Sequence, residues 1–532
     1  MKTNNKLIAF VFAVILLATS CVELDLTPYD RESDLSFWKK PESAVYTLNA
    51  CYPSLSNAYE VLYFDCMTDN AYTKVSNAFN QSIGNGSYST ADPYVQSIWS
   101  SRYEGIRRCN LLLNNIDQVP DLSENLRNRY VAEATVIRAF HYFELYSKFG
   151  DIPYFTNILS IEESQSIERT AKSVVVDNIL NDLTEVISNN HLPRSYDGED
   201  KGRVTHWAAA ALKARILLFE ARYSEVKSVT EDIINNGGFQ LFGNYEQLFT
   251  VANENNSEVI LDVQYIANSR EHNVQYHFLP PSLGGYSQLS PTQELVDSYA
   301  TIDGFSIDNA PESSYDSDEP YQNRDPRLTA TVIYDGNSYP LADGSNHVVY
   351  TARGSGPDGY GASSDASATG YYLKKYWDKS YRANLMSGLN IILIRYADVL
   401  LMHAEALVEL GEMNAAGWDK TIRPLRARAG FAASALEFPS GSQSELREIV
   451  RRERRSELAM EGLRRTDIIR WEIAEDVMNG WIHGIKTDDA IGTDDGYIRV
   501  EQRTFDANKH YLMPIPQNER DLNPNLEQNP NW

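Results

Sequence analysis

The chain has 532 residues, 42% of them hydrophobic, so it can bury one very large core or several. Its formal net charge of −25 argues against nucleic acid and anionic lipid surfaces as partners. Tyrosine is abundant, with 33 Tyr against 18 Phe, which favours a protein that exposes aromatic rings to water, although many of these rings will be core.

Residues 1–20 are predicted to be a targeting segment. Lys2 and Lys6 precede an apolar run that is too short to span a membrane comfortably. The run ends in small residues directly before Cys21, a pattern that resembles a bacterial lipobox. We therefore expect Cys21 to be lipidated and to anchor the mature chain, residues 21–532, to a membrane. A signal peptide removed without lipidation is the alternative.

Three further cysteines follow: Cys51, Cys66 and Cys109. No two of them form a CxxC pair, so the sequence supports neither a zinc site nor a redox motif. A bridge between two of the three would be compatible with export but cannot be assigned. We expect no metal and no cofactor.

The next elements alternate between helix and loop. Residues 33–58 are predicted to hold a cap and a helix that opens at Pro41. Residues 63–88 are rich in Asn, Ser, Gly and aromatic residues without periodicity, which indicates long surface loops.

Helices then dominate as far as residue 236. Residues 99–113 carry an apolar stripe at three- and four-residue spacing, and residues 132–149 continue the pattern to a terminating Gly150. Arg138 and His141 lie one turn apart there and could form an acid/base pair, but in so aromatic a helix a structural role is favoured. Ala-rich helical hairpins are predicted at 202–236 and again at 395–429, a pattern typical of tetratricopeptide-like stacking.

Residues 237–388 are irregular. Short apolar runs at 258–263 and 328–334 are predicted to be strands. Gly, Ser, Asp and Tyr crowd the remainder, above all at 354–368. A phosphate-binding loop is excluded at 354–361, because no Gly-Lys-Ser/Thr or strand-to-helix context accompanies the glycines.

The stretch from Glu445 to Trp471 is the most strongly patterned. Glu453, Glu457 and Glu461 recur every four residues and would form one row on a helix, beside apolar positions. Gly462 follows as the expected C-cap. Half-buried carboxylates need partners, and six arginines lie nearby in sequence: Arg451, Arg452, Arg454, Arg455, Arg464 and Arg465. An ion-paired helix joining two layers is favoured over a catalytic carboxylate set or a nucleic-acid face.

This stretch also carries a resemblance, because REIVRRERRSELAMEGLRRTDIIRW is similar to the C-terminal helix of the SusD/RagB family of outer-membrane nutrient-binding lipoproteins. Further similar motifs follow the family's order along almost the whole chain: AEATVIRAFHYFELYSKFGDIP, GRVTHWAAAALKAR, NRDPRL, RYADVLLMHAEAL and YLMPIPQNERDLNPNLEQNPNW. Glu23 and Asp25, just after Cys21, also resemble lipoproteins of Bacteroidota exported to the cell surface.

Periodicity and resemblance together predict a mainly α protein. Tetratricopeptide-like helical hairpins, from about 93–236 and 394–471, would pack against an irregular loop-rich half with short strands, from about 59–92 and 237–388. A C-terminal segment, 472–532, completes a single unit.

The resemblance implies a surface lipoprotein of the outer membrane that binds a glycan (oligosaccharide) nutrient. It would deliver this ligand to a SusC-like TonB-dependent barrel. The alternatives are a peptide-binding RagB-like uptake lipoprotein and a surface glycoside hydrolase. No GxSxG, HExxH, P-loop or dinucleotide motif occurs, and no two of the 73 Asp and Glu stand out as a glycosidase pair, so we expect no enzyme.

A glycan site needs aromatic platforms beside amides and carboxylates. We therefore expect contacts from aromatic residues in loops, with their polar neighbours. The first loop supplies Asp69, Asn70, Tyr72, Asn77 and Phe79. The later loops supply Tyr286, Gln288, Arg353, Tyr360 and Trp377. The family's strongest aromatic in the first loop is a tryptophan, whereas only Tyr72 stands here, which argues against starch.

Overall fold

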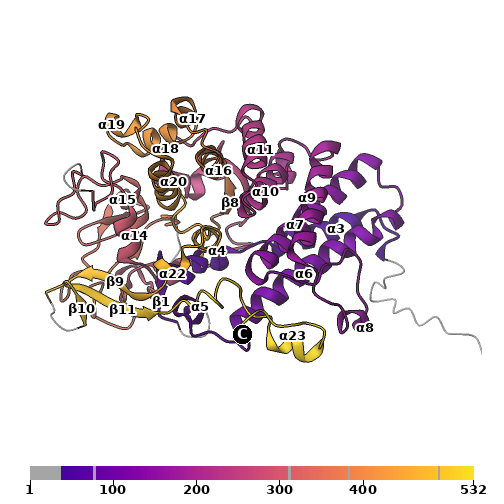
Figure 1. Cartoon of the computed structure of the whole chain (residues 1–532), viewed down its shortest axis with the longest axis horizontal. Helices are drawn as coiled ribbons and strands as arrows, with labels where there is room; N and C mark the ends of the chain where they lie inside the picture. Colours follow the sequence, from indigo (N-terminus) through magenta and orange to yellow (C-terminus); the bar gives the residue numbers. More distant parts are fainter. Residues whose placement is uncertain (1–36, 76–79, 310–312, 381–383, 489–491) are drawn as a thin grey trace, which may run out of the picture.

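The computed structural model describes residues 37–75, 80–309, 313–380, 384–488 and 492–532. Cys21, Asn77 and Phe79 lie outside these described residues. Figure 1 shows long helices gathered towards one end of the molecule and loops with short strands towards the other. The predicted mainly helical fold class is confirmed.

The helical part is built from neighbouring helices joined by short connections. Helix α6 (Pro93–Asn115) packs on α7 (Glu124–Phe149), and α10 (His206–Phe219) packs on α11 (Tyr223–Asn236). The other long helices are α3 (Glu42–Cys51), α9 (Lys172–Asn189), α16 (Tyr396–Glu409), α18 (Ile422–Ala429) and α20 (Gln443–Glu457). Helix α11 also packs on α16, so successive hairpins stack.

Small residues allow this close stacking. The four alanines at 208–211 of α10 are all buried, on every side of the helix, between α9, α11 and α16. Trp207, beside them, is 2% exposed. A helix buried on all sides has no solvent face, which explains why this segment is apolar all round.

Local sequence sets the ends of the long helices. The Asp92 carboxylate accepts hydrogen bonds from the amides of Tyr94 and Val95, and Pro93 occupies the first turn of α6. Ser442 and Glu445 form a capping box at the start of α20. Gly150, at φ 73°, ends α7 in a conformation that side chains rarely adopt.

Shorter helices connect these elements. They are α4 (Ala58–Phe64), α5 (Gln81–Asn85), α8 (Ile161–Ser164), α12 (Tyr245–Leu248), α13 (Gln275–Phe278), α14 (Gln293–Ser298), α15 (Arg327–Thr331), α17 (Ala415–Lys420), α19 (Ala433–Leu436), α21 (Arg464–Arg470), α22 (Ala474–Val477) and α23 (Gln517–Leu522). Short 3-10 turns lie at Tyr52–Ser54, Asp65–Met67, Ile116–Gln118, Gly198–Asp200, Val251–Asn253 and Pro281–Leu283.

The strands form small antiparallel sheets. Four are two-stranded: β1 (Ala71–Thr73) with β3 (Leu289–Pro291), β2 (Val259–Val263) with β8 (Ile391–Arg395), β4 (Val332–Ile333) with β7 (Tyr372–Leu373), and β5 (Ser338–Pro340) with β6 (Asn346–Val348). The fifth has the order β10 (Thr493–Asp494), β11 (Tyr497–Arg503), β9 (Gly480–Lys486). Most pairings join segments far apart in sequence.

One predicted strand is wrong. Residues 328–334 were expected to be extended, but α15 takes up most of the run and only β4 is a strand. The Asp325 carboxylate accepts a hydrogen bond from the Arg327 amide. Pro326, directly before α15, already has helical backbone angles. This local turn, together with the burial of Arg327, overrides the β-propensity of the run.

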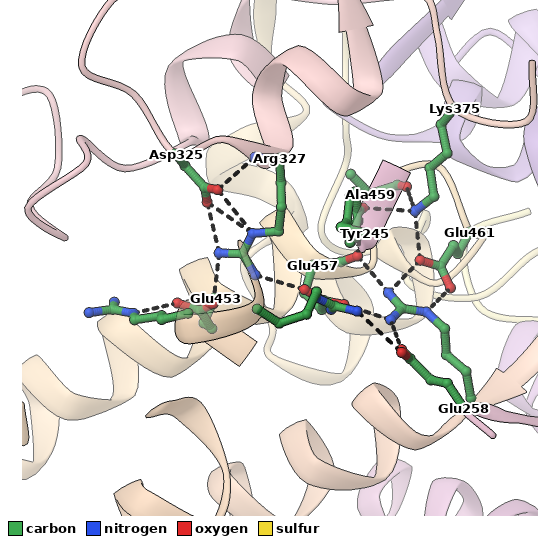
Figure 2. Close-up of polar contacts among 12 residues, drawn as sticks. Tyr245, Glu258, Asp325, Arg327, Lys375, Glu453, Glu457, Ala459 and Glu461 are labelled. Atoms are coloured by element: carbon green, nitrogen blue, oxygen red, sulfur yellow. Dashed lines mark hydrogen bonds and ion pairs between the residues drawn. The ribbon is translucent and has the colours of Figure 1, made fainter. Parts of the chain in front are cut away.

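The glutamate row is a buried ion-pair network, as the sequence analysis favoured (Figure 2). Glu457 pairs through one oxygen with Arg395 at 2.6 Å and through the other with Arg327 at 2.8 Å. Arg428 also donates to it. Burial alone would raise the pKa of Glu457, but these three guanidiniums outweigh burial and hold it well below its usual range.

The two flanking glutamates are paired in the same way. Glu453 contacts Arg327 at 2.7 Å and Arg426 at 2.8 Å. Glu461 contacts Arg395 and Lys375, each at 2.7 Å. Because Arg327 and Lys375 come from the loop-rich half, the network joins that half to α20.

Two expectations about this stretch are wrong. Helix α20 ends at Glu457, before Gly462, and Met460 already has φ 63°. The glutamate row also does not pair with the arginines that lie near it in sequence, because its partners come from elsewhere in the chain. Arg454, one of those nearby arginines, instead pairs with Asp398 and Asp467. Gly462 instead allows close packing, because a Cβ there would lie 2.8 Å from the Val61 carbonyl oxygen.

One large hydrophobic core runs through both halves, with smaller clusters around α16 and α20 and near the C-terminus. Within the described ranges, no helix is long and apolar enough to cross a bilayer. The three thiols of Cys51, Cys66 and Cys109 are free and buried. Burial raises the pKa of Cys66 and Cys109, which makes both poor nucleophiles.

Candidate functional site

The predicted site loops meet through the β1–β3 ladder. Tyr72 lies opposite Ser290 in this ladder, and the Lys74 amide donates to the Gln288 carbonyl at 3.1 Å. The first loop and the segment around Tyr286 are therefore neighbours, although about two hundred residues separate them in sequence.

The Gly-rich segment joins the same face. Lys74 Nζ donates to the carbonyl oxygens of Ser364 and Ala366. The Ser282 amide donates to Asp358 Oδ1 at 2.9 Å, and its hydroxyl donates to the other carboxylate oxygen. Three loop segments, around residues 72, 286 and 360, thus form one contiguous surface.

A stacked aromatic pair lies on this surface. Tyr286 is 47% exposed, and its ring lies 5.5 Å from that of Tyr276 with an interplanar angle of 13°. The Tyr286 amide donates to the Tyr276 carbonyl at 2.8 Å, which fixes the two residues relative to each other. Gly285 is required in this turn, because a Cβ there would lie 2.1 Å from the Leu279 carbonyl oxygen.

Polar groups border this pair. Gln288 is half-buried, and its Oε1 is itself buried without a hydrogen-bond partner among the described residues. Burial lowers the pKa of His277 to about 4, so the imidazole is neutral at neutral pH. Tyr72 is half-buried, and its hydroxyl accepts a hydrogen bond from Gln81 at 3.4 Å.

The other predicted residues of the later loops differ in exposure. Arg353 is exposed and lies over the half-buried Tyr360 ring at 5.2 Å. Trp377 is only 4% exposed, and its indole N–H donates to the Pro340 carbonyl at 2.7 Å. The structure therefore brings Arg353 and Tyr360 to the surface together and packs Trp377 into the core.

The side chains of Asp69 and Asn70 bind the guanidinium groups of two arginines. Arg464 donates two 2.8 Å hydrogen bonds to the Asp69 carboxylate, and Arg455 lies 2.9 Å from it. Burial opposes ionisation of Asp69, but Arg455 and Arg464 outweigh it and lower its pKa. Asn70 accepts from Arg455 Nε at 2.9 Å and donates to Asp65. Both residues are almost fully buried and position other side chains.

Next to Asp69 lies a cleft of about 580 Å³. It is bordered by α14, α20, α21, α22 and β9. Figure 1 labels α14, α20, α22 and β9 on the side of the molecule that holds the short strands. Arg451 and Arg452 line the α20 wall, Glu294 and Asp297 line the α14 wall, and Trp481 lies on β9. Trp481 is 40% exposed.

Sequence reasoning missed two features of this region. Tyr276 completes the stacked pair, but it lies in a short helix and carried no loop signal. Trp481 lies in β9, which the predicted loop-rich half did not include. In the sequence, Trp481 was visible only as an aromatic residue within a short strand-like run, GWIHGIK.

No group of three or more possible His, Cys, Asp or Glu metal ligands occurs in the part of the chain that the structure describes. His141 is buried, and burial lowers its pKa well below the usual range. Arg138 is held by Asn110 and Asp182. These contacts agree with the structural role favoured for that pair.

Two family models match the chain. The model described as "SusD family" matches residues 245–532, and the model described as "Starch-binding associating with outer membrane" matches residues 24–218. SusD-like protein P25 of Formosa agariphila is 28% identical over 99% of this chain and 98% of its own length.

Solved structures share the fold. A SusD-like carbohydrate binding protein from Bacteroides fragilis has a TM-score of 0.83 and 29% identity, over 92% of this chain and 100% of its own. Surface glycan-binding protein A from Bacteroides fluxus has a TM-score of 0.69 and 22% identity, over 93% of this chain and 100% of its own.

Proposed function

This chain belongs to the SusD family, and from that premise we propose that it is a surface lipoprotein that binds an oligosaccharide and delivers it to a SusC-like TonB-dependent outer-membrane transporter. The similar Bacteroides fragilis structure is named as carbohydrate binding, and the family model over residues 24–218 carries an outer-membrane description. Both support the proposal.

The observation that carries the binding role is the stacked Tyr276–Tyr286 pair, of which Tyr286 is exposed, on the surface where three loops meet. The ring of a sugar has apolar C–H faces that pack on aromatic rings and hydroxyl edges that need hydrogen-bond partners. Tyr286 offers the ring, since 47% of its surface is exposed.

Other groups on this surface would extend this platform. Tyr72 lies across the β1–β3 ladder, and Arg353 with Tyr360 lies on the Gly-rich segment tied to it through Ser282 and Asp358. Asp69, Asn70 and Trp377 would support the site from behind, because they are buried. Hydrogen bonds between the loops pre-organise the surface, which lowers the entropy cost of binding.

Calorimetry with an oligosaccharide panel tests the binding role. Wild type should bind at least one glycan, and Tyr286→Ala should weaken that binding. Tyr46→Ala is a matched control, because Tyr46 is 63% exposed on α3 in the helical part. Equal losses in both variants, or tight binding of peptides alone, would contradict the proposal.

Anchoring and partnership need separate experiments. We propose that Cys21 carries the lipid, because it follows small residues and an apolar leader. Mild detergent extraction should then recover the protein with a barrel of transporter size. Recovery without any barrel in several detergents would contradict the delivery role.

A non-catalytic role is part of the proposal. The glutamate row, which holds the most regularly spaced carboxylates of the sequence, is buried in ion pairs and cannot reach a substrate. Bound oligosaccharide should therefore be recovered uncut. New reducing ends after incubation would favour the glycoside hydrolase instead.

A further inference from the structure

Two arginines in the cleft beside Asp69 form no ion pair with a described residue. Neither Arg451 nor Arg452 makes a hydrogen bond or ion pair with any described residue, and Arg451 Nε is buried without an acceptor. Arg451 lies over the Trp471 ring at 4.7 Å. Both side chains are half-buried, and neither has a carboxylate within ion-pair distance among the described residues, unlike Arg454, Arg455 and Arg464 of the same stretch.

The surrounding contacts hold this wall of the cleft in place. Arg455 and Arg464 both form ion pairs with the Asp69 carboxylate, which fixes their positions. Their two guanidiniums therefore share one carboxylate beside Arg451 and Arg452. Trp471 donates its indole N–H to Glu405 at 2.7 Å, which fixes the ring that Arg451 covers. Burial lowers the pKa of both Arg451 and Arg452, as expected for cations that lack close anionic partners.

Carboxylates from α14 also line the cleft, and further carboxylates border it. Glu294 on α14 accepts from the His483 amide and ring, and Asp297 accepts from Gln293 at 2.8 Å. Glu448, Asp308 and Asp476 are exposed, where solvent and salt screen their charge. The cleft therefore has a cationic α20 wall and an acceptor-rich α14 wall.

We propose that this cleft binds an acidic sugar residue of the ligand, with its carboxylate or sulfate ester held by Arg451 and Arg452. An acidic sugar needs both walls, because its acid group requires cationic donors and its hydroxyls require acceptors such as Glu294 and Asp297. Trp481, exposed on β9, offers a ring face at the mouth of the cleft. This inference rests on the proposed glycan-binding function and specifies the class of glycan.

Calorimetry with two matched pairs of oligosaccharides tests the inference. One pair is an oligogalacturonate and its methyl ester, and the other is a sulfated galactan oligosaccharide and its desulfated form. Each pair keeps the sugar backbone and removes the charge. Wild type should bind the charged member of at least one pair at least tenfold more tightly than the neutral member, and which pair responds distinguishes carboxylate from sulfate.

The variant R451Q/R452Q should weaken binding of the charged member about tenfold or more, because both cationic donors to its acid group are lost. It should leave neutral glycans unaffected. R447Q is the matched control, because Arg447 is on the same helix but pairs with Glu409 away from the cleft. Thermal unfolding of all variants checks that the fold is intact, and R451K/R452K, which keeps both charges, should retain part of the preference.

The outcomes separate this inference from the proposed function. If a neutral glycan binds and R451Q/R452Q binds all ligands as wild type does, the acidic-sugar site is wrong and the glycan-binding function stands. If no saccharide binds but an acidic peptide such as tetraglutamate does, both are wrong. Equal binding of charged and neutral members, or equal losses in R447Q and R451Q/R452Q, also overturns the inference.

Discussion

Replacing Glu457 by Gln should strongly destabilise the protein. Glu457 is fully buried and is the shared partner of Arg327, Arg395 and Arg428, which come from three different segments of the chain. Gln keeps the size of the side chain but removes the negative charge. Removing one partner of a buried ion pair costs about 3–5 kcal/mol, because the remaining charges stay buried and uncompensated.

Urea unfolding at pH 7 measures this cost, with Glu412→Gln as the control. Glu412 pairs with Lys227, and both side chains are more than a third exposed. An exposed pair contributes about 0–1 kcal/mol, so the same substitution there should shift the unfolding midpoint little. Equal shifts in the two variants would refute the view that the network stabilises the fold through burial.

The effect also has a defined pH dependence. The pKa of Glu457 is lowered in the folded state, so its contribution to stability is present above the unfolded-state pKa of about 4.3 and is lost as pH falls through the folded-state pKa. The difference in stability between wild type and E457Q should therefore be constant from pH 5 to 8 and should shrink below about pH 4. A difference that grows as the pH falls would contradict the assignment.

Three further results are expected. Tyr72→Ala and Tyr286→Ala should each weaken ligand binding by about 1–3 kcal/mol in calorimetry without changing thermal stability, and full affinity in the double variant would place the site elsewhere. Cys21→Ser should abolish fatty-acid labelling and release the protein from membranes, whereas unchanged labelling would exclude this anchor. The three buried cysteines should react with a maleimide only after denaturation, and rapid labelling of the native protein would contradict their burial.

The glutamate row shows what the sequence could and could not predict. A four-residue spacing beside apolar positions correctly indicated buried, ion-paired carboxylates. It could not identify the partners, because Arg327 and Arg395 lie 130 and 62 residues away from Glu457 along the chain. The spacing of residues along a helix indicates which of its faces is buried. The ion-pair partners of that face depend on the tertiary fold.

The loop-rich half was harder to predict for a related reason. Composition marked Tyr286 and Trp377 alike as aromatic residues in loops, yet Tyr286 is exposed and Trp377 is packed against Tyr339. Its part of the one large core is built from short strands and turns that carry no long periodic signal. An aromatic residue in such a segment therefore serves the core or the surface according to pairings such as β4–β7, which single-sequence patterns do not specify.

Helix α20 links the fold to the proposed site. Successive residues of a helix point about 100° apart, so the run from Arg451 to Arg455 cannot serve one face. Glu453 and Arg454 enter buried ion pairs, whereas Arg451, Arg452 and Arg455 line the cleft. The buried pairs fix the rotation of the helix and so hold the cleft arginines in place. A change at Glu453 or Glu457 should therefore impair binding as well as stability, whereas a change at Arg451 or Arg452 should impair binding alone.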